Sequence, residues 1–193
     1  MISLGTKFYK NSNENKINGE YFKGVGTIGN NYFTYLIVFA NSMIKCHKVM
    51  SFSVFKEKLL SGLIQINLPS SCKVHFSDST RYKLNDDYLE ETNEDFIKIV
   101  EDSIIELNGG KGRCNKCIEL FKSYLLNDTE QNYFNLKSQF EDLPSTKKVL
   151  FEMVDYKDPL IALMKTGEKF SPEGRKHMLI DYFEDEWNEK DFK

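Results

Sequence analysis

Histidine and cysteine, which supply many catalytic and metal-binding groups, are scarce in this sequence. Its 193 residues include three histidines, four cysteines and one tryptophan. It contains neither a G-x-S-x-G nucleophile motif nor an H-E-x-x-H metal motif. These absences exclude the serine hydrolases and zinc proteases that a sequence motif identifies. They do not exclude a triad assembled by folding, because its members need not be close in sequence.

Long apolar runs are absent as well. The longest, Tyr32–Ala40, is far shorter than the ~20 residues that a helix needs to span a bilayer. It is rich in aromatic and β-branched residues, which favours a buried strand. The first residues, "MISLGTKFYKNSNENK", lack the apolar segment of a secretory signal. We therefore expect a cytoplasmic protein with reduced cysteines and no membrane partner.

The composition is that of an ordinary folded protein, with 40% hydrophobic and 28% charged residues. A net charge of −3 disfavours nucleic acid as a direct partner. Residues 1–113 carry 14 basic and 13 acidic residues, whereas the rest of the chain carries 12 and 16. The last ten residues, "EDEWNEKDFK", hold five acidic residues and two lysines. A partner with a basic surface is therefore expected to meet this end.

Strand patterns dominate the first half. "TKFY" and "GEYFKGVGTI" are expected to be extended, and Asn41-Ser42 predicts a hairpin between Tyr32–Ala40 and Met43–Met50. "CKVHF" and "RYKL" predict two more short strands. "GVGTIG" matches the letters of the dinucleotide-binding glycine motif, but that motif must open a helix. A strand pattern follows it here, so a glycine-rich strand and turn is the better interpretation.

Two helices are predicted in the same half. The first covers residues 51–64, capped by Ser51 or Ser53, with Phe55, Leu59 and Leu63 on one face. The second runs from about Asn93 to Leu107. Thr92 and Asp95 form its capping signal, and Asn108-Gly109-Gly110 supplies its stop. Its expected apolar face consists of Phe96, Ile97, Val100, Ile104 and Leu107.

Helical patterns dominate beyond Gly112. Helices are expected at Cys114–Leu126 and at Thr129–Phe140, and Ser145 is expected to cap another helix that runs to about Tyr156. Pro159 breaks or restarts the chain, and Ser171-Pro172 begins a final helix. Its apolar face is expected to consist of Met178, Leu179, Tyr182, Phe183 and Trp187. The prediction is an α+β fold: an antiparallel sheet with two helices in residues 1–110, then an all-α region in residues 111–193.

The loop "NGGKGRCNKC" offers two candidate sites. Cys114 and Cys117 have the spacing of half a zinc site, and Cys72-x-x-His75 has a similar spacing. Strand alternation would place Cys72 and His75 on opposite faces. Cys114 and Cys117 also continue the apolar stripe of Ile118, Phe121 and Leu125, which favours core packing over zinc, and zinc over a redox dithiol.

The same loop could bind an anion. Lys111, Arg113 and Lys116 surround a helix N-terminus, where free N–H groups and the helix dipole favour negative charge. The sequence does not match a phosphate-binding loop, because glycine follows the Gly-Lys pair where serine or threonine is needed. A hinge between two helices is the simpler interpretation of these glycines.

The final helix supplies the partner-binding candidates: Asp181, Tyr182, Glu184, Asp185 and Trp187. Its acids are expected to point outward, and such runs are most often solvated faces. They could instead attract a basic partner, with Tyr182 and Trp187 as anchors. His177 lies one turn before Asp181 and could act as a base, although such surface pairs usually have no catalytic role.

Three functional hypotheses remain. The leading one is a non-enzymatic protein-binding module, such as an immunity or anti-defence inhibitor; the Lys-, Asn- and Ile-rich composition is similar to that of proteins from AT-rich bacterial genomes and their mobile elements or phages. The second is a small-ligand or anion-binding domain or an enzyme, using the Lys111–Lys116 loop or His177. The third is a structural zinc protein using Cys114 and Cys117.

Overall fold

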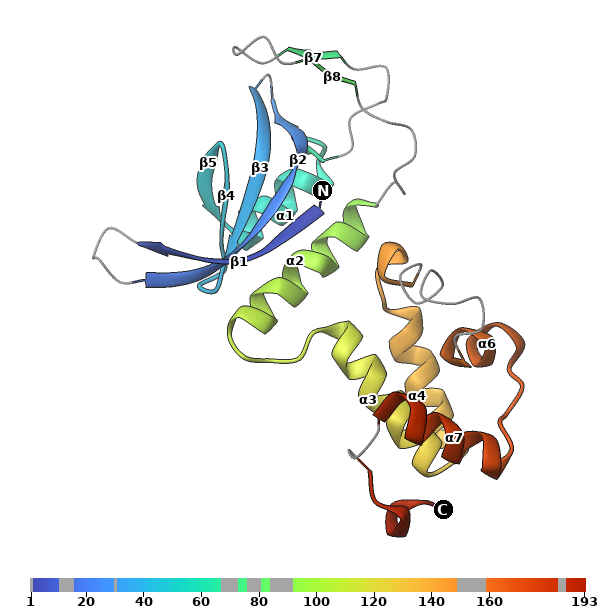
Figure 1. Cartoon of the computed structure of the whole chain (residues 1–193). Coiled ribbons are helices and arrows are strands. Elements are labelled where there is room, and N and C mark those ends of the chain that lie inside the picture. The colour runs from blue at the N-terminus through green and yellow to red at the C-terminus, as the bar shows by residue number, and fades with distance from the viewer. Residues whose placement is uncertain are drawn as a thin grey trace. The chain divides into compact units, whose positions relative to one another are not determined.

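In the computed structural model, consecutive strands of the N-terminal half pair antiparallel to form the main sheet (Figure 1). The strand order is β1-β2-β3-β4-β5, and β6 pairs with β2. The strands are β1 Ile2–Lys10, β2 Lys16–Ile28, β3 Asn31–Phe39, β4 Met43–Cys46, β5 Lys48–Ser51 and β6 Ile64–Gln65. A separate two-stranded sheet pairs β7 (Lys73–His75) with β8 (Arg81–Lys83).

The structure describes residues 2–10, 16–29, 31–66, 73–75, 81–83, 92–148, 159–183 and 187–193. The chain divides into an N-terminal unit, residues 1–110, and a C-terminal unit, residues 111–193. An antiparallel sheet with helices is followed by a helical region, which confirms the predicted α+β fold class. Among the described helices, none has the length and apolar character needed to cross a membrane.

One face of the main sheet carries the core of the N-terminal unit. Helices α1 (Phe52–Leu60) and α2 (Asn93–Leu107) supply the other side of this core. The rings of Phe22 and Phe96 meet edge to face with centroids 6.1 Å apart. The buried residues are Phe22, Phe33, Leu36, Val38, Ile44, Cys46, Phe55, Leu59, Ile64, Ile66, Phe96, Ile97 and Val100.

Local signals set the ends of α2 as predicted. The Asp95 N–H donates to Thr92 Oγ1 at 3.0 Å, which caps the helix start. At the other end Gly109 has φ 78, and the N–H groups of Gly109 and Gly110 donate to the carbonyls of Glu106 and Ile105. This is the Schellman arrangement, which a glycine adopts without steric cost.

Two boundaries in the N-terminal unit were predicted wrongly. Met43–Met50 is not a single strand: His47 has φ 46, and the chain turns there from β4 into β5. The helix predicted over residues 51–64 ends at Leu60. Gly62 has φ 76, which takes the chain out of the helix and leaves Leu63 56% exposed instead of on the apolar face.

The described helices of the C-terminal unit surround a second core. They are α3 Arg113–Leu126, α4 Glu130–Glu141, α6 Pro159–Thr166 and α7 Pro172–Phe183, followed by the 3-10 turn Glu189–Asp191. Thr129 caps α4 and Ser171 caps α7, each accepting a backbone N–H three residues on. The buried residues of this core are Cys117, Phe121, Tyr124, Leu125, Leu136, Leu143, Leu160, Leu163, Leu179 and Phe183.

Three details of this unit differ from the sequence prediction. Ile118 was expected in the core but is 40% exposed, and Tyr124 is buried in the core instead. Tyr182 is 53% exposed and does not line the apolar face of α7. Residues 145–148 are helical with Pro144 accepting their first backbone bond, so Ser145 is the first helical residue and not the cap. The remainder of that predicted helix lies outside the described residues.

Candidate functional site

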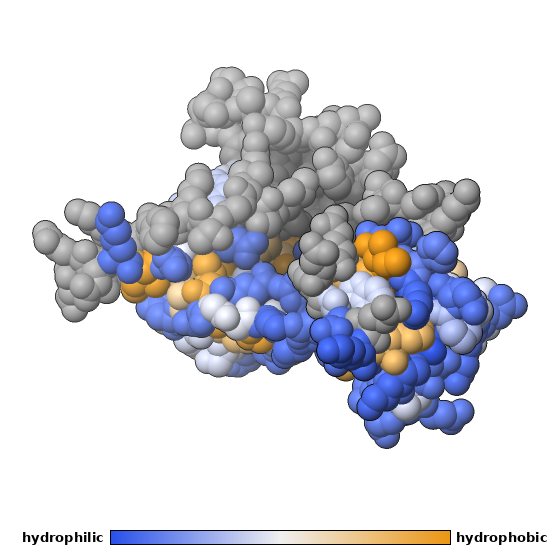
Figure 2. All heavy atoms as spheres, turned by 60° about the horizontal axis from the view of Figure 1, so that its bottom comes forward, coloured by the Kyte–Doolittle hydropathy of each residue, from blue (hydrophilic) through white to orange (hydrophobic). Residues whose placement is uncertain are grey.

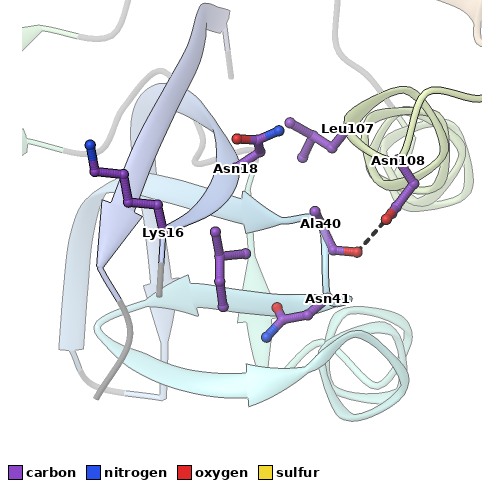
Figure 3. Close-up of a pocket in the computed structure, with 7 residues that line it drawn as sticks. Lys16, Asn18, Ala40, Asn41, Leu107 and Asn108 are labelled. Atoms are coloured by element: carbon purple, nitrogen blue, oxygen red, sulfur yellow. Dashed lines mark hydrogen bonds between the residues drawn. The ribbon is translucent and has the colours of Figure 1, made fainter. Parts of the chain in front are cut away.

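Two adjoining pockets form a polar groove in the N-terminal unit (Figure 3). The larger, pocket 1, has a volume of about 350 Å³, and the smaller, pocket 2, about 210 Å³. Pocket 1 is lined by Lys16, Ile17, Asn18, Ala40, Asn41, Leu107 and Asn108. Pocket 2 is lined by Asn18, Glu20, Ser103, Glu106 and Leu107. Because Asn18 and Leu107 belong to both, the pockets form one continuous groove.

The groove lies where the apolar row of β2 gives way to polar residues. Side chains two residues apart on a strand share a face, so Asn18 and Glu20 point to the same side as the buried Phe22. The last turns of α2 face these residues, and Figure 3 shows Asn18 and Leu107 pointing toward one another. The turn between β3 and β4 closes the other end.

Hydrogen bonds determine what the groove can offer a ligand. The Asn108 amide nitrogen donates to the carbonyls of Ala40 and Ile104, each at 2.7 Å, which leaves the amide oxygen to accept. The Ser103 hydroxyl donates to the Ile99 carbonyl at 3.0 Å, so its oxygen also remains an acceptor. At the other end, Asn41 Oδ1 accepts from the Met43 N–H at 3.3 Å. Its amide N–H groups are therefore the donors there.

The outer face of α7 is the second candidate surface. Leu179 and Phe183 point into the core, and the Phe183 ring lies 6.5 Å from that of Phe121 on α3. Asp181 lies between these two in sequence and is exposed, because 100° per residue turns it away from the core. Ile180 and Tyr182 flank it and are 54% and 53% exposed.

The other residues predicted for this surface, Glu184, Asp185 and Trp187, do not add to the exposed face that the structure describes. Glu184 and Asp185 lie outside the described residues. Trp187 is partly buried and packs against the core of the C-terminal unit, so it does not extend the exposed face. Figure 2 shows a mainly hydrophilic surface on which hydrophobic residues form separate patches. Among the described residues of the C-terminal unit, the large exposed hydrophobic ones are Ile118, Phe134, Ile180 and Tyr182.

The three cations of the predicted anion site are placed around the start of α3, and two of them contact carboxylates. Lys111 Nζ bonds to Glu119, and Arg113 Nε donates to Asp142 Oδ2 at 2.8 Å. Lys116 is exposed, and Gly112 caps the helix without a side-chain bond. Because two of the three charges are compensated inside the unit, the local field favours an anion less than the sequence suggests.

The cysteines of the same loop belong to the core. Cys117 is fully buried, and burial with Cys114 nearby raises the pKa of its thiol to about 12. Cys114 is partly buried against the same cluster. Within the described residues, no group of three or more His, Cys, Asp or Glu side chains could hold a metal ion. Cys72, the other proposed zinc ligand, lies outside those residues.

The three histidines belong to different elements of the chain. His47 is exposed at the β4–β5 turn of the N-terminal unit. His177 is exposed on α7 of the C-terminal unit, as is the neighbouring Asp181. The backbone of His75 lies in β7.

A family model for a domain of unknown function (DUF7638) matches residues 7–111, more than half of the chain. The chain belongs to this family. The DUF7638 match contains every residue of the groove, whereas α7 lies beyond it. No curated protein and no solved structure matches the chain.

The sequence analysis missed the groove. Its asparagines come from a strand, a turn and a helix end, far apart along the chain. Asn108 was interpreted only as part of a helix stop, and Asn41 only as part of a hairpin turn. Each local interpretation is correct, but neither contains a signal that the two side chains line one pocket.

Proposed function

We propose that the protein is a non-enzymatic protein-binding module whose α7 outer face docks a partner with a basic surface. The observation that carries the proposal is the exposure of Ile180 and Tyr182, each by more than half, beside the exposed Asp181. Aliphatic and aromatic side chains next to a carboxylate provide both apolar area and charge complementarity to such a partner.

The setting of α7 favours this role. Leu179 and Phe183 anchor the helix to the core from its opposite side, so the exposed side chains stand on a fixed element. The chain beyond residue 113 has four more acidic than basic residues, 16 against 12, which would attract and orient a basic partner.

The chemistry of the described residues supports binding over catalysis. Burial raises the pKa of the Cys46 thiol to about 11 and that of Cys117 to about 12, so neither is a ready thiolate nucleophile at neutral pH. An inhibitor of the immunity or anti-defence type, which blocks a basic macromolecule by occupying its surface, would need no catalytic group.

The test is affinity capture with the tagged full chain in a lysate of the organism that encodes it. Asp181→Lys and Ile180→Ser should each weaken binding of the captured protein by about tenfold or more, as for central interface residues. Phe134→Ser, which removes another exposed hydrophobic side chain from α4, is the matched control and should leave binding unchanged. Equal binding by wild type and all three variants would rule out α7 as the docking surface.

A further inference from the structure

The main sheet has a second face, opposite to the one on which helices α1 and α2 pack (Figure 1). Side chains alternate along a strand, so the sequence neighbours of the core residues Phe22, Leu36 and Ile44 lie on this second face. Ile37 illustrates the alternation, because it is 4% exposed yet is not part of the core under the helices. Both described helices of the N-terminal unit lie on the core side, so neither of them covers the second face.

The second face carries aromatic, apolar and lysine side chains. The strand register aligns one residue from each of β2, β3, β4 and β5 in a row: Tyr21, Ile37, Lys45 and Val49. Tyr35 on β3 stacks on Tyr21, with ring centroids 5.7 Å apart and ring planes inclined by 17°. Both tyrosines and Lys45 are partly exposed, and Val49 is 57% exposed. Flat rings and a cation are therefore held next to one another on a rigid element.

Charge is segregated between the strands of the main sheet and helix α2. Strands β1 to β5 contain one acidic residue, Glu20, which lines pocket 2 on the helix side. The same strands contain six lysines: Lys7, Lys10, Lys16, Lys23, Lys45 and Lys48. Helix α2 has the opposite balance, with five acidic residues and one lysine. The net charge of −3, which disfavours nucleic acid for the chain as a whole, therefore does not describe the sheet.

We propose that the second face of the sheet binds single-stranded nucleic acid. Aromatic rings stack on bases with little regard to sequence, and lysines attract the phosphates that link the bases. Sheet surfaces with aromatic rings are a recurrent platform for unpaired bases, which a duplex keeps stacked inside. In this protein Tyr35 and Tyr21 supply the rings and Lys45 supplies the phosphate contact. An acidic partner without bases would use the lysine but not the pair of rings.

The proposal does not depend on α7. The second face lies in the N-terminal unit and inside the family match, whereas the docking face of the proposed function lies in the C-terminal unit. The two surfaces can therefore be tested separately on the same full-length protein. Ile180→Ser should bind nucleic acid as the wild type does, even if it fails to bind the protein partner.

The experiment is a fluorescence anisotropy titration of the full chain with labelled single strands of about 12 uridines or about 12 deoxythymidines. Saturable binding is expected, and the tighter of the two strands identifies RNA or DNA as the preferred form. The deoxythymidine strand annealed to its complement should bind at least about tenfold more weakly, because its bases are no longer available for stacking. Inorganic polyphosphate, which has the charge but no bases, should not displace the strand at equal phosphate concentration.

Variants at Tyr35 test base stacking. Tyr35→Leu should weaken binding by about tenfold, because it removes one ring from the platform. Tyr35→Phe keeps the ring and should bind within about twofold of the wild type. Circular dichroism melting curves establish that both variants are folded at the temperature of the titration.

Variants at two lysines test the phosphate contact. Lys45→Gln should make the slope of log affinity against log salt concentration shallower by about 0.7, the contribution of one phosphate contact on a single strand. Lys58→Gln is the matched control, since Lys58 is also partly exposed but lies on α1, on the other side of the sheet. It should retain the salt dependence of the wild type.

Several results would overturn the proposal. These are the absence of saturable binding, equal affinity for the single strand and the duplex, displacement by polyphosphate, or equal losses in Tyr35→Leu and Tyr35→Phe. Equal salt slopes for Lys45→Gln and Lys58→Gln would remove the phosphate contact from this face. Loss of oligonucleotide binding in Ile180→Ser would place the strand on α7 and refute the second face as its site.

Discussion

Gly26 is a residue whose missing side chain allows two strands to meet. A Cβ built there would lie 2.4 Å from Phe33 Cζ and 2.7 Å from the Gln65 carbonyl oxygen. Both distances are shorter than real carbon contacts, so a methyl group would push apart β2, β3 and the end of β6. Gly26 therefore serves close packing, and Gly29, with φ 56, lies in the turn after β2, as the context of "GVGTIG" in the sequence indicates.

Gly26→Ala should lower the free energy of unfolding by about 1–3 kcal/mol, the usual cost of overpacking a core. The control is Gly174→Ala on α7, where the nearest atom to a new Cβ, Ser171 Oγ, is 3.4 Å away. Because alanine has a higher helix propensity than glycine, this change should be neutral or should stabilise the protein by up to ~1 kcal/mol. Urea unfolding measures both, and equal effects of the two changes would contradict the argument.

Ionisation of the buried Cys117 thiol makes the free energy of unfolding depend on pH in the alkaline range. Its pKa is about 12 in the folded chain against an ordinary value of 9.0, because burial disfavours the thiolate. Burial raises the pKa of Cys46 to about 11 in the same way. A pKa that is raised on folding contributes stability that is complete below the unfolded value and lost as pH rises toward the folded one.

Unfolding free energy should therefore fall steadily as pH rises from 9 toward 12. Below pH 9, Cys117→Ala should be less stable than the wild type because it leaves a cavity. Its decline above pH 9 should nevertheless be shallower, since one of the titrating groups is gone. Urea unfolding of both proteins across this range is the measurement. Parallel curves would show that Cys117 does not contribute to the pH dependence.

At the scale of elements, Arg175 on α7 forms hydrogen bonds to the end of α3 and to the last described residues. It is 6% exposed, and its guanidinium donates to the Leu125 carbonyl at the end of α3 at 2.9 Å and to the Lys193 carbonyl at 3.1 Å. The Phe192 ring lies 4.7 Å from its central carbon. One side chain thus connects α7, α3 and the last described residues, and it positions the helix that carries the proposed docking face.

Arg175→Met should cost about 2–4 kcal/mol of unfolding free energy, because it removes two charge-assisted bonds and leaves the buried Leu125 carbonyl without its guanidinium donor. Lys176→Met is the control. Its ammonium also lies over Phe192, at 5.4 Å, but it is partly exposed, so a loss below about 1 kcal/mol is expected. Thermal or urea unfolding compares them. Similar losses would mean that the buried bonds of Arg175 contribute little.

Element boundaries were predictable where a local side chain or a glycine sets them. Thr92 and Ser171 cap helices at the expected positions, since capping depends on atoms within three residues. His47 was not predictable as a turn, because its left-handed backbone follows from the pairing of β4 with β5. Nothing in the alternation of Met43–Met50 marks that break.

At the scale of the whole molecule, each unit has a hydrophobic core of its own. The N-terminal core is built from the sheet, α1 and α2, and the C-terminal core from α3, α4, α6 and α7. A chain segment that buries its own apolar residues meets the main requirement for folding alone. The family match ends at residue 111, one residue beyond the boundary between the units.

A protein of residues 1–110 should therefore fold by itself and unfold cooperatively on heating. Far-ultraviolet circular dichroism and a single sigmoidal melting curve are the measurements. A fragment without a cooperative transition would show that the N-terminal core needs the C-terminal unit.

The sequence by itself determined the class of the fold, the helix starts and most of the core residues. These follow from periodicity, capping residues and glycines, which act over a few residues and can be read along the chain. It also indicated that Asp181 would be exposed. The tertiary structure alone placed Asn18, Asn41 and Asn108 in one groove, and brought Glu20 and Glu106 to the same pocket. Such proximity depends on how β2, the β3–β4 turn and α2 pack, and packing joins residues whose separation in sequence carries no signal.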